Sequence, residues 1–170
     1  MSIRFNMDEI FELAEMIETN GANYYRKAAE IFSDQNIKKL LSGLSEMENS
    51  HKIIFHAMRT ELKENDKAAV SVTSQDKDQV APYLRALADS KIFNIKDHPS
   101  KKLSGNETLA QIFNTALNME KDSIVFYLGM KEIIPEKLGK NKIDGIIKEE
   151  MNHIIILNET WASLASASTI

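Results

Sequence analysis

The sequence predicts an all-α protein: a four-helix bundle built from two antiparallel helix hairpins that are copies of each other. The chain has only 6 Gly and 3 Pro, and long stretches rich in Glu, Lys, Leu, Ala and Ile dominate it, which favours helices over sheets. Apolar residues recur at 3-4 spacing in each stretch, as on the buried face of a helix. A set of Glu, His and Tyr residues occurs twice, with each residue of the second set 102 positions after its counterpart (for example, 120 − 18).

The helices follow one another with recognisable start and stop signals. They are expected at about 8–32, 37–64, 107–132 and 141–164. Asp8 is the expected N-cap of the first helix, and the polar residues 33–36 indicate a turn before the second. Residues 104–106 are a start signal for the third helix. Pro135 and Gly139 mark a tight connection to the fourth.

A crossover at about 65–106 separates the hairpins and is too long for a simple turn. Its segment 82–88 favours a short extra helix. A crossover of this kind lets the second and third helices run parallel, as in bundles with one long connection. We therefore expect residues 1–170 to form a single domain.

Composition excludes several classes of function. The net charge of −4 and the lack of a basic cluster argue weakly against nucleic-acid binding. No stretch is apolar enough to span a membrane, and the acidic N-terminus does not resemble a signal peptide, so we expect a cytoplasmic protein. The chain has 0 Cys, which excludes disulfides, cysteine nucleophiles, thiolate zinc sites and iron–sulfur clusters. Redox chemistry would therefore need a metal held by oxygen and nitrogen.

The repeated set lies inside the apolar stripes of the four helices. Its first copy is Glu18, Tyr25, Glu48 and His51, and its second is Glu120, Tyr127, Glu150 and His153. In each antiparallel hairpin the two Glu are equidistant from the turn, about 15 residues or roughly 22 Å away. The acids of both hairpins should therefore meet in one layer near the middle of the bundle.

A buried carboxylate is costly unless it is paired or coordinated, and the four stripes contain no Lys or Arg. Two divalent cations would balance four carboxylates, with neutral imidazoles as further ligands. Oxygen-rich ligands with one imidazole per ion suit iron or manganese better than structural zinc. The alternatives are a metal-free polar network with shared protons, or acids directed into a solvent cleft.

By analogy with other helical bundles, the carboxylates of the two Glu-x-x-His pairs, Glu48 and Glu150, would bridge the two ions. The remaining residues would complete one ion each. These are Glu18 with His51 for one ion, and Glu120 with His153 for the other.

Other residues have possible supporting roles. Tyr25 and Tyr127 could hydrogen-bond to the carboxylates or mediate electron transfer, or could be core tyrosines with satisfied hydroxyls. Gly21 and its counterpart Ser123 leave space that could admit a small oxidant. Glu149 could orient His51 across the bundle, although the counterpart of Glu149 is Met47 and the support would be one-sided.

Together these motifs resemble the rubrerythrin-type members of the ferritin-like di-iron proteins. The residues that carry the resemblance are Glu18-x-x-Gly21-x-x-x-Tyr25, Glu48-x-x-His51, Glu120-Lys-Asp-Ser-Ile-Val-Phe-Tyr127 and Glu150-x-x-His153. The resemblance implies two iron ions that cycle between Fe(II) and Fe(III) while reducing hydrogen peroxide or dioxygen. An external electron donor would return the centre to Fe(II).

Two departures from the rubrerythrin pattern favour a slower oxidase, a ferroxidase or an iron-handling protein. Rubrerythrins usually carry a rubredoxin-like tail with four Cys, and this chain has 0 Cys. They also have an extra carboxylate one turn after the Glu of the third helix, where this chain has Ser123. The open alternatives are an iron-sequestering protein without efficient turnover, and a structural bundle whose site holds zinc or no metal.

The first two helices also carry apolar residues outside the seam, the apolar stripe that contains the repeated Glu, His and Tyr. These extra residues predict a homodimer, the commonest oligomer. They include Ile10, Ile17, Ile53 and Ile54.

Overall fold

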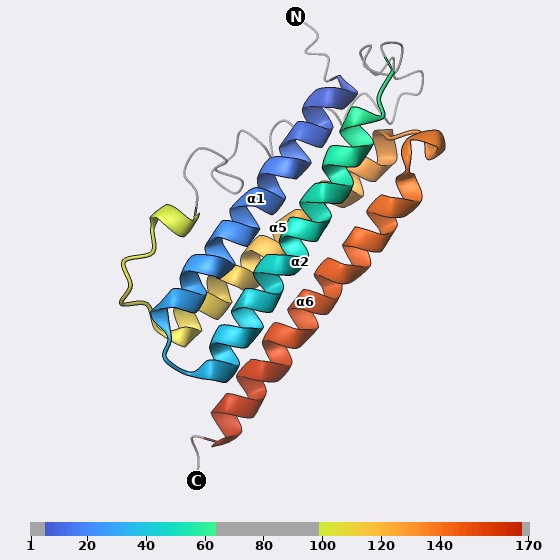
Figure 1. The fold of residues 1–170 in the computed structure, drawn as a ribbon. Coiled ribbons are helices and arrows are strands. Elements are labelled where there is room, and N and C mark those ends of the chain that lie inside the picture. The colour runs from blue at the N-terminus through green and yellow to red at the C-terminus, as the bar shows by residue number, and fades with distance from the viewer. Residues whose placement is uncertain (1–5, 64–98, 168–170) are drawn as a thin grey trace, which may run out of the picture.

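A computed structural model describes residues 6–63 and 99–167, and these form an all-helical bundle. Its long helices are α1 (Met7–Ile31), α2 (Gln35–Thr60), α5 (Leu109–Ile133) and α6 (Lys140–Ala167). Two short 3-10 helices accompany them, η2 (Pro99–Lys101) and η3 (Glu136–Leu138). The predicted fold class is confirmed: α1 and α2 form one antiparallel hairpin, α5 and α6 form the other, and they pack side by side (Figure 1).

Side-chain caps fix where the helices begin. The Asn6 side chain accepts a hydrogen bond from the backbone N–H of Glu9, whose carboxylate in turn accepts from the backbone N–H of Asn6. Thr108 and Gln111 form the same reciprocal box at the start of α5. Asp34 caps α2 by accepting from two backbone N–H groups. Each cap satisfies donors that the first helical turn leaves unpaired.

The helix ends differ from the expected ones by a few residues. The N-cap of α1 is Asn6, while Asp8 instead accepts a hydrogen bond at 2.9 Å from Nε of Arg59. Helix α2 ends at Thr60, four residues before the expected 64. At 104–106 the chain forms a turn that Glu107 holds by accepting from the N–H groups of Ser104 and Gly105, and α5 starts only after Thr108.

Helices α2 and α5 run in the same direction, as the colour gradient in Figure 1 shows, which agrees with a long crossover between the hairpins. The expected extra helix at 82–88 lies outside the described residues. Gly139 ends η3 with a φ of 91°, a left-handed conformation that favours glycine, and so lets the chain turn directly into α6. None of the described helices is both long and apolar enough to cross a membrane.

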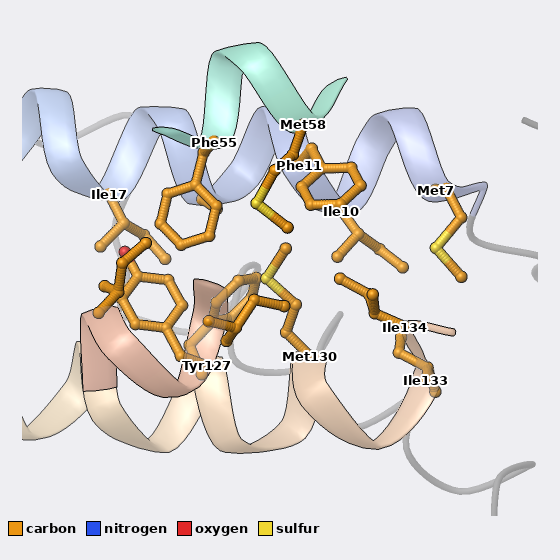
Figure 2. Close-up of a cluster of buried hydrophobic side chains, with 14 of the residues drawn as sticks. Met7, Ile10, Phe11, Ile17, Phe55, Met58, Tyr127, Met130, Ile133 and Ile134 are labelled. Carbon is orange, nitrogen blue, oxygen red and sulfur yellow. The ribbon is translucent and has the colours of Figure 1, made fainter. Parts of the chain in front are cut away.

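The apolar core formed by the described residues has two parts, one toward each end of the bundle. The first cluster, drawn in Figure 2, includes Phe11, Phe55 and Met130. The second includes Tyr24, Leu41 and Phe113. Each cluster draws on residues from both hairpins. The two clusters therefore fix the hairpins against each other and hold the part of the bundle that lies between the clusters in place.

Two of the residues that suggested a homodimer lie inside the chain's own core. Ile10 is 0% exposed and Ile17 is 7% exposed, so neither can contribute to a contact between subunits. Ile53 is 68% exposed and remains available on the surface of α2. The error arose because the apolar face of α1 is wider than a single seam, which is normal for a helix packed in a globular core.

Candidate metal centre

The six predicted metal ligands lie together in a buried layer between the two apolar clusters. Helix α1 supplies Glu18, α5 supplies Glu120, and α2 and α6 each supply one Glu-x-x-His pair. None of the six is more than 4% exposed. Their meeting follows from the sequence, because antiparallel helices bring residues equidistant from a turn to the same height. Whether they bind metal stays a prediction.

Ligand atoms of these residues form two groups in which all atoms lie within 4.8 Å of one another. One group consists of Glu18, Glu48, His51 and Glu150. The other consists of Glu48, Glu120, Glu150 and His153. The two groups share Glu48 and Glu150, the residues expected to bridge two ions, and each has one further Glu and one His.

The distances between the histidines and the carboxylates repeat across the two halves. Nδ1 of His51 lies 3.5 Å from Oε2 of Glu18 and 3.0 Å from Oε1 of Glu150. Nδ1 of His153 lies 3.5 Å from Oε2 of Glu120 and 3.3 Å from Oε1 of Glu48. The imidazole rings are 5.6 Å apart and inclined by 21°. Both rings therefore present the same nitrogen, Nδ1, to the carboxylates.

Several of these atoms are buried without a hydrogen-bond partner. In the part of the chain that the structure describes, they are Oε2 of Glu18, both carboxylate oxygens of Glu150, Nδ1 of His51 and both ring nitrogens of His153. The nitrogens and oxygens approach within ion-pair distance, but their directions do not make hydrogen bonds. Buried polar groups are normally satisfied, so unpaired lone pairs that converge from four helices fit the coordination of cations. The chemistry of the donor set, four carboxylates and two imidazoles, fits a pair of divalent metal ions.

The two tyrosines hydrogen-bond to carboxylates of the opposite hairpin. The phenol of Tyr25 donates to Oε1 of Glu120, and the phenol of Tyr127 donates to Oε1 of Glu18. A hydrogen bond to a carboxylate was among the expected roles of both tyrosines, but the sequence did not indicate which carboxylate each one contacts. The spacing along α1 does indicate a partner on another helix. Tyr25 is seven residues from Glu18, roughly 10 Å along the helix, which is too far for a hydrogen bond between the two.

Burial and mutual repulsion shape the charge of the acids. Desolvation, reinforced by neighbouring carboxylates, raises the pKa of Glu18 and of Glu48 well above the usual value. Desolvation likewise raises the pKa of Glu120 to about 8, although His153 opposes the shift. In the absence of metal, these carboxyls therefore bind protons that exposed carboxyls would lose at neutral pH.

The pKa values of Glu150 and of the two histidines shift in the direction opposite to the one that burial alone would cause. Burial favours a raised pKa for Glu150, but contacts with His153 and His51 outweigh it and hold the pKa below its usual value. Burial would lower the pKa of each histidine, yet neighbouring carboxylates raise both. In the metal-free layer these contacts favour the ionised form of Glu150 and the protonated form of the two imidazoles, so divalent cations would compete with protons for the histidines.

The predicted contact between Glu149 and His51 is confirmed. Nε2–H of His51 donates to Oε2 of Glu149 at 2.7 Å, while the Glu149 side chain remains 59% exposed. The bond places the ring hydrogen on Nε2, so that Nδ1 faces the carboxylates with its lone pair when the ring is neutral.

The space expected at Gly21 is filled. A Cβ atom at Gly21 would lie 3.0 Å from Oε2 and 3.1 Å from Cδ of Glu48, so this glycine makes room for the Glu48 side chain rather than for an oxidant. The counterpart, Ser123, is 8% exposed and donates from Oγ to the carbonyl of Met119 at 3.0 Å.

Comparison with solved structures supports the fold. The chain matches the crystal structure of a "putative ferritin-like diiron-carboxylate protein" from Thermotoga maritima with a TM-score of 0.70 and 22% sequence identity, over 92% of this chain and 94% of that one. The fold is ferritin-like. No protein-family model matches the sequence, and no curated protein matches it either.

Proposed function

We propose that this protein is a di-iron carboxylate oxidoreductase that reduces hydrogen peroxide or dioxygen, in the manner of a rubrerythrin-like peroxidase or a ferroxidase. The observation that carries the proposal is the pair of four-residue groups that share Glu48 and Glu150. Oxygen-rich groups with one imidazole each favour iron or manganese over the closed sites of structural zinc.

A pair of iron ions in this layer would supply the two electrons that convert hydrogen peroxide and two protons into two water molecules. The protein's own residues would bind, orient and protect that pair. Glu18 and His51 would hold one ion, and Glu120 and His153 would hold the other. The shared carboxylates of Glu48 and Glu150 would contribute to both. The apolar clusters on either side of the layer limit access of bulk water, which strengthens the electrostatic interactions within it.

Tyr25 and Tyr127 would position the terminal carboxylates. Each phenol occupies one oxygen of its partner carboxylate, Glu120 or Glu18, and leaves the other oxygen to a metal. Burial and the neighbouring carboxylates raise the pKa of both phenols well above the usual value, so both stay protonated as donors at neutral pH. Electrons for repeated turnover would come from an external donor protein or small molecule.

One observation favours a second candidate, an iron-sequestering protein without efficient turnover. The residue one turn after Glu120 on α5 is Ser123, and its hydroxyl is engaged by the carbonyl of Met119 on the same helix. In this chain that position therefore offers no additional carboxylate to accompany a change in iron oxidation state. Under this alternative, the same six ligands would retain iron after one slow oxidation.

Anaerobic titration of the metal-free protein with Fe(II), followed by rapid mixing with peroxide or with oxygenated buffer, separates the candidates. Two irons per chain, fast oxidation by one oxidant and repeated cycling with a reductant support the enzyme. Two irons with slow oxidation and retention support sequestration. Parallel titrations with Mn(II) and Zn(II) test the choice of metal.

Substitution of the shared carboxylates tests the site itself. Glu48→Ala and Glu150→Ala should each abolish stoichiometric binding, because each removes a ligand from both groups. The exposed Glu46 on α2 supplies a matched control, and Glu46→Ala should bind two ions normally. Unchanged binding in Glu48→Ala and Glu150→Ala would contradict the proposed centre.

A further inference from the structure

The twofold repeat of the centre is broken where Glu149 contacts a predicted ligand. His51 donates from Nε2 to Glu149, a residue of the other hairpin. Shifting this pair by the repeat interval replaces His51 by His153 and Glu149 by Met47, whose thioether side chain is at best a weak acceptor. Accordingly, Nε2 of His153 is buried without a hydrogen-bond partner within 6–63 and 99–167.

This difference affects how well each imidazole can serve as a ligand. A carboxylate that accepts the outer N–H of a histidine fixes the ring's orientation and tautomer and makes the inner nitrogen a stronger donor. His51 has this support, and its Nδ1 faces Glu18 and Glu150. His153 presents its Nδ1 in the same way, but among the residues that the structure describes no group accepts from its outer nitrogen.

Because Glu149 lies at the surface, its effect on His51 can be tested without disturbing the folded core. Its side chain is 59% exposed, whereas the His51 side chain is 0% exposed. Substitution of Glu149 therefore changes the partner of His51 without opening a cavity in the core. Met47 packs at the edge of the second apolar cluster, where it is only partly buried.

We propose that the two metal positions are unequal: the position of Glu18 and His51 binds a divalent cation more tightly, and so fills first, because Glu149 positions His51. This inference rests on the proposed metal centre. Loss of such an outer partner typically lowers metal affinity about 10–100-fold, so the two dissociation constants should differ by about that factor. Glu149 is a positioning residue, since it acts through His51 and does not itself face the carboxylate layer.

Titration of the metal-free protein with Co(II), followed by its visible absorption and by competition with a chelator, measures the two constants. We expect two steps in the natural protein. Glu18→Ala should remove the tight step, and Glu120→Ala should remove the weak one. Co(II) serves as the probe because it is followed directly, without redox turnover.

An exchange of the two unequal residues provides the decisive comparison. Glu149→Met should weaken the tight step to the level of the other, and Met47→Glu should strengthen the weak step. The double variant, with both substitutions, should restore two separate steps with their order reversed. Glu149→Gln keeps an oxygen acceptor for His51 and should fall between the natural protein and Glu149→Met.

A control for charge and a check of folding complete the experiment. Glu46→Met removes one negative charge from an exposed position beside Met47, and it should leave both steps unchanged. Thermal unfolding of each metal-free variant verifies that the bundle forms. Two ions bound with equal affinity, or two steps unaltered in Glu149→Met, would overturn the inference and leave the metal centre standing. Failure of the natural protein to bind two ions would overturn the centre itself.

Discussion

The phenol of Tyr25 on α1 donates a hydrogen bond to Oε1 of Glu120 on α5, which lies in the other hairpin. Tyr127 makes the equivalent bond to Glu18 in the reverse direction. Both bonds lie in the interior and join the hairpins through predicted metal ligands. Each tyrosine therefore affects both the stability of the bundle and the orientation of a terminal carboxylate.

Replacement of Tyr25 by Phe should destabilise the metal-free protein by about 1–3 kcal/mol, because Oε1 of Glu120 is left buried without its donor. Tyr127→Phe should have a similar effect through Glu18. Urea unfolding of the metal-free variants measures the loss. Tyr24→Phe is the matched control: its phenol donates to the backbone carbonyl of Ile112 at 3.0 Å, outside the carboxylate layer. Tyr24→Phe should reduce stability without changing metal affinity, whereas Tyr25→Phe should also weaken metal binding. An equal change of metal affinity in the two variants would argue against a specific role for Tyr25.

The metal-free protein should lose stability as the pH rises from about 5 to about 8. The pKa of Glu120 is raised from 4.5 to about 8 in the folded state, so the folded protein binds more protons than the unfolded chain in this range. The raised pKa values of Glu18, Glu48 and both histidines act in the same direction. The lowered pKa of Glu150 stabilises the folded protein at pH values above the usual pKa of a glutamate, and this contribution is lost only on acidification. Chemical denaturation at a series of pH values measures the slope.

With saturating divalent metal the sign of this slope should reverse. Protons and metal ions compete for the same carboxylates and imidazoles, so metal binding, and the stability it adds, increases with pH. Binding should also release protons, which a weakly buffered titration detects. A stability profile that is identical with and without metal would contradict this prediction.

Gly21→Ala should weaken metal binding at both positions by about tenfold, in the range that loss of a ligand's supporting contacts produces. The added Cβ would lie 3.0 Å from Oε2 of Glu48, and this shared carboxylate would have to move. Chelator competition measures the two affinities. The effect differs from that of Glu149→Met, which should change one position only.

Gly43 provides the control for this substitution, since a Cβ there would meet nothing within 4 Å. Gly43→Ala should stabilise α2 by about 0.5–1 kcal/mol, the usual gain for this exchange in a helix interior, and leave metal binding unchanged. Equal metal affinities in the two alanine variants would show that the Gly21–Glu48 contact has no influence on the centre.

The homodimer remains a prediction, now resting on exposed residues alone. Ile53 on α2 is 68% exposed, and its repeat counterpart Ile155 on α6 is 52% exposed. We expect a dimer in sedimentation experiments. Ile53→Lys should weaken it by at least about tenfold if this side chain is buried between subunits, since burial of an Ile is worth about 1.5–3 kcal/mol. A monomer in the natural protein would contradict the prediction.

The sequence predicted the parts of the structure that follow from regular geometry. Constant helical rise and antiparallel pairing placed Glu18, Glu48, Glu120 and Glu150 in one layer before any contact was known. The shared position of Glu48 and Glu150 was expected by analogy with other helical bundles, not from spacing alone. These relations depend on the backbone, which a periodic sequence specifies well.

Side-chain contacts between hairpins were less accessible to prediction. The spacing of Tyr25 and Glu18 indicates a partner on another helix, but which carboxylate each phenol reaches depends on how the two hairpins pack. The role of Gly21 depends on the conformation of Glu48, and the sequence suggested an open space instead. Helix ends also shifted, because Asn6 and Thr108 compete successfully with neighbouring polar residues for the cap.

The internal repeat has a consequence for how far the two halves of the layer can differ. Each hairpin carries one copy of every kind of predicted ligand, so two identical hairpins associated about a twofold axis would form the same layer with two equal halves. Fusing them into one chain frees the two copies to diverge while the set of ligands stays complete. Glu149 and Met47 occupy equivalent places in the two copies and are no longer alike. A centre formed by one chain can in this way hold two ions with different properties, which a symmetric pair of identical hairpins could not provide.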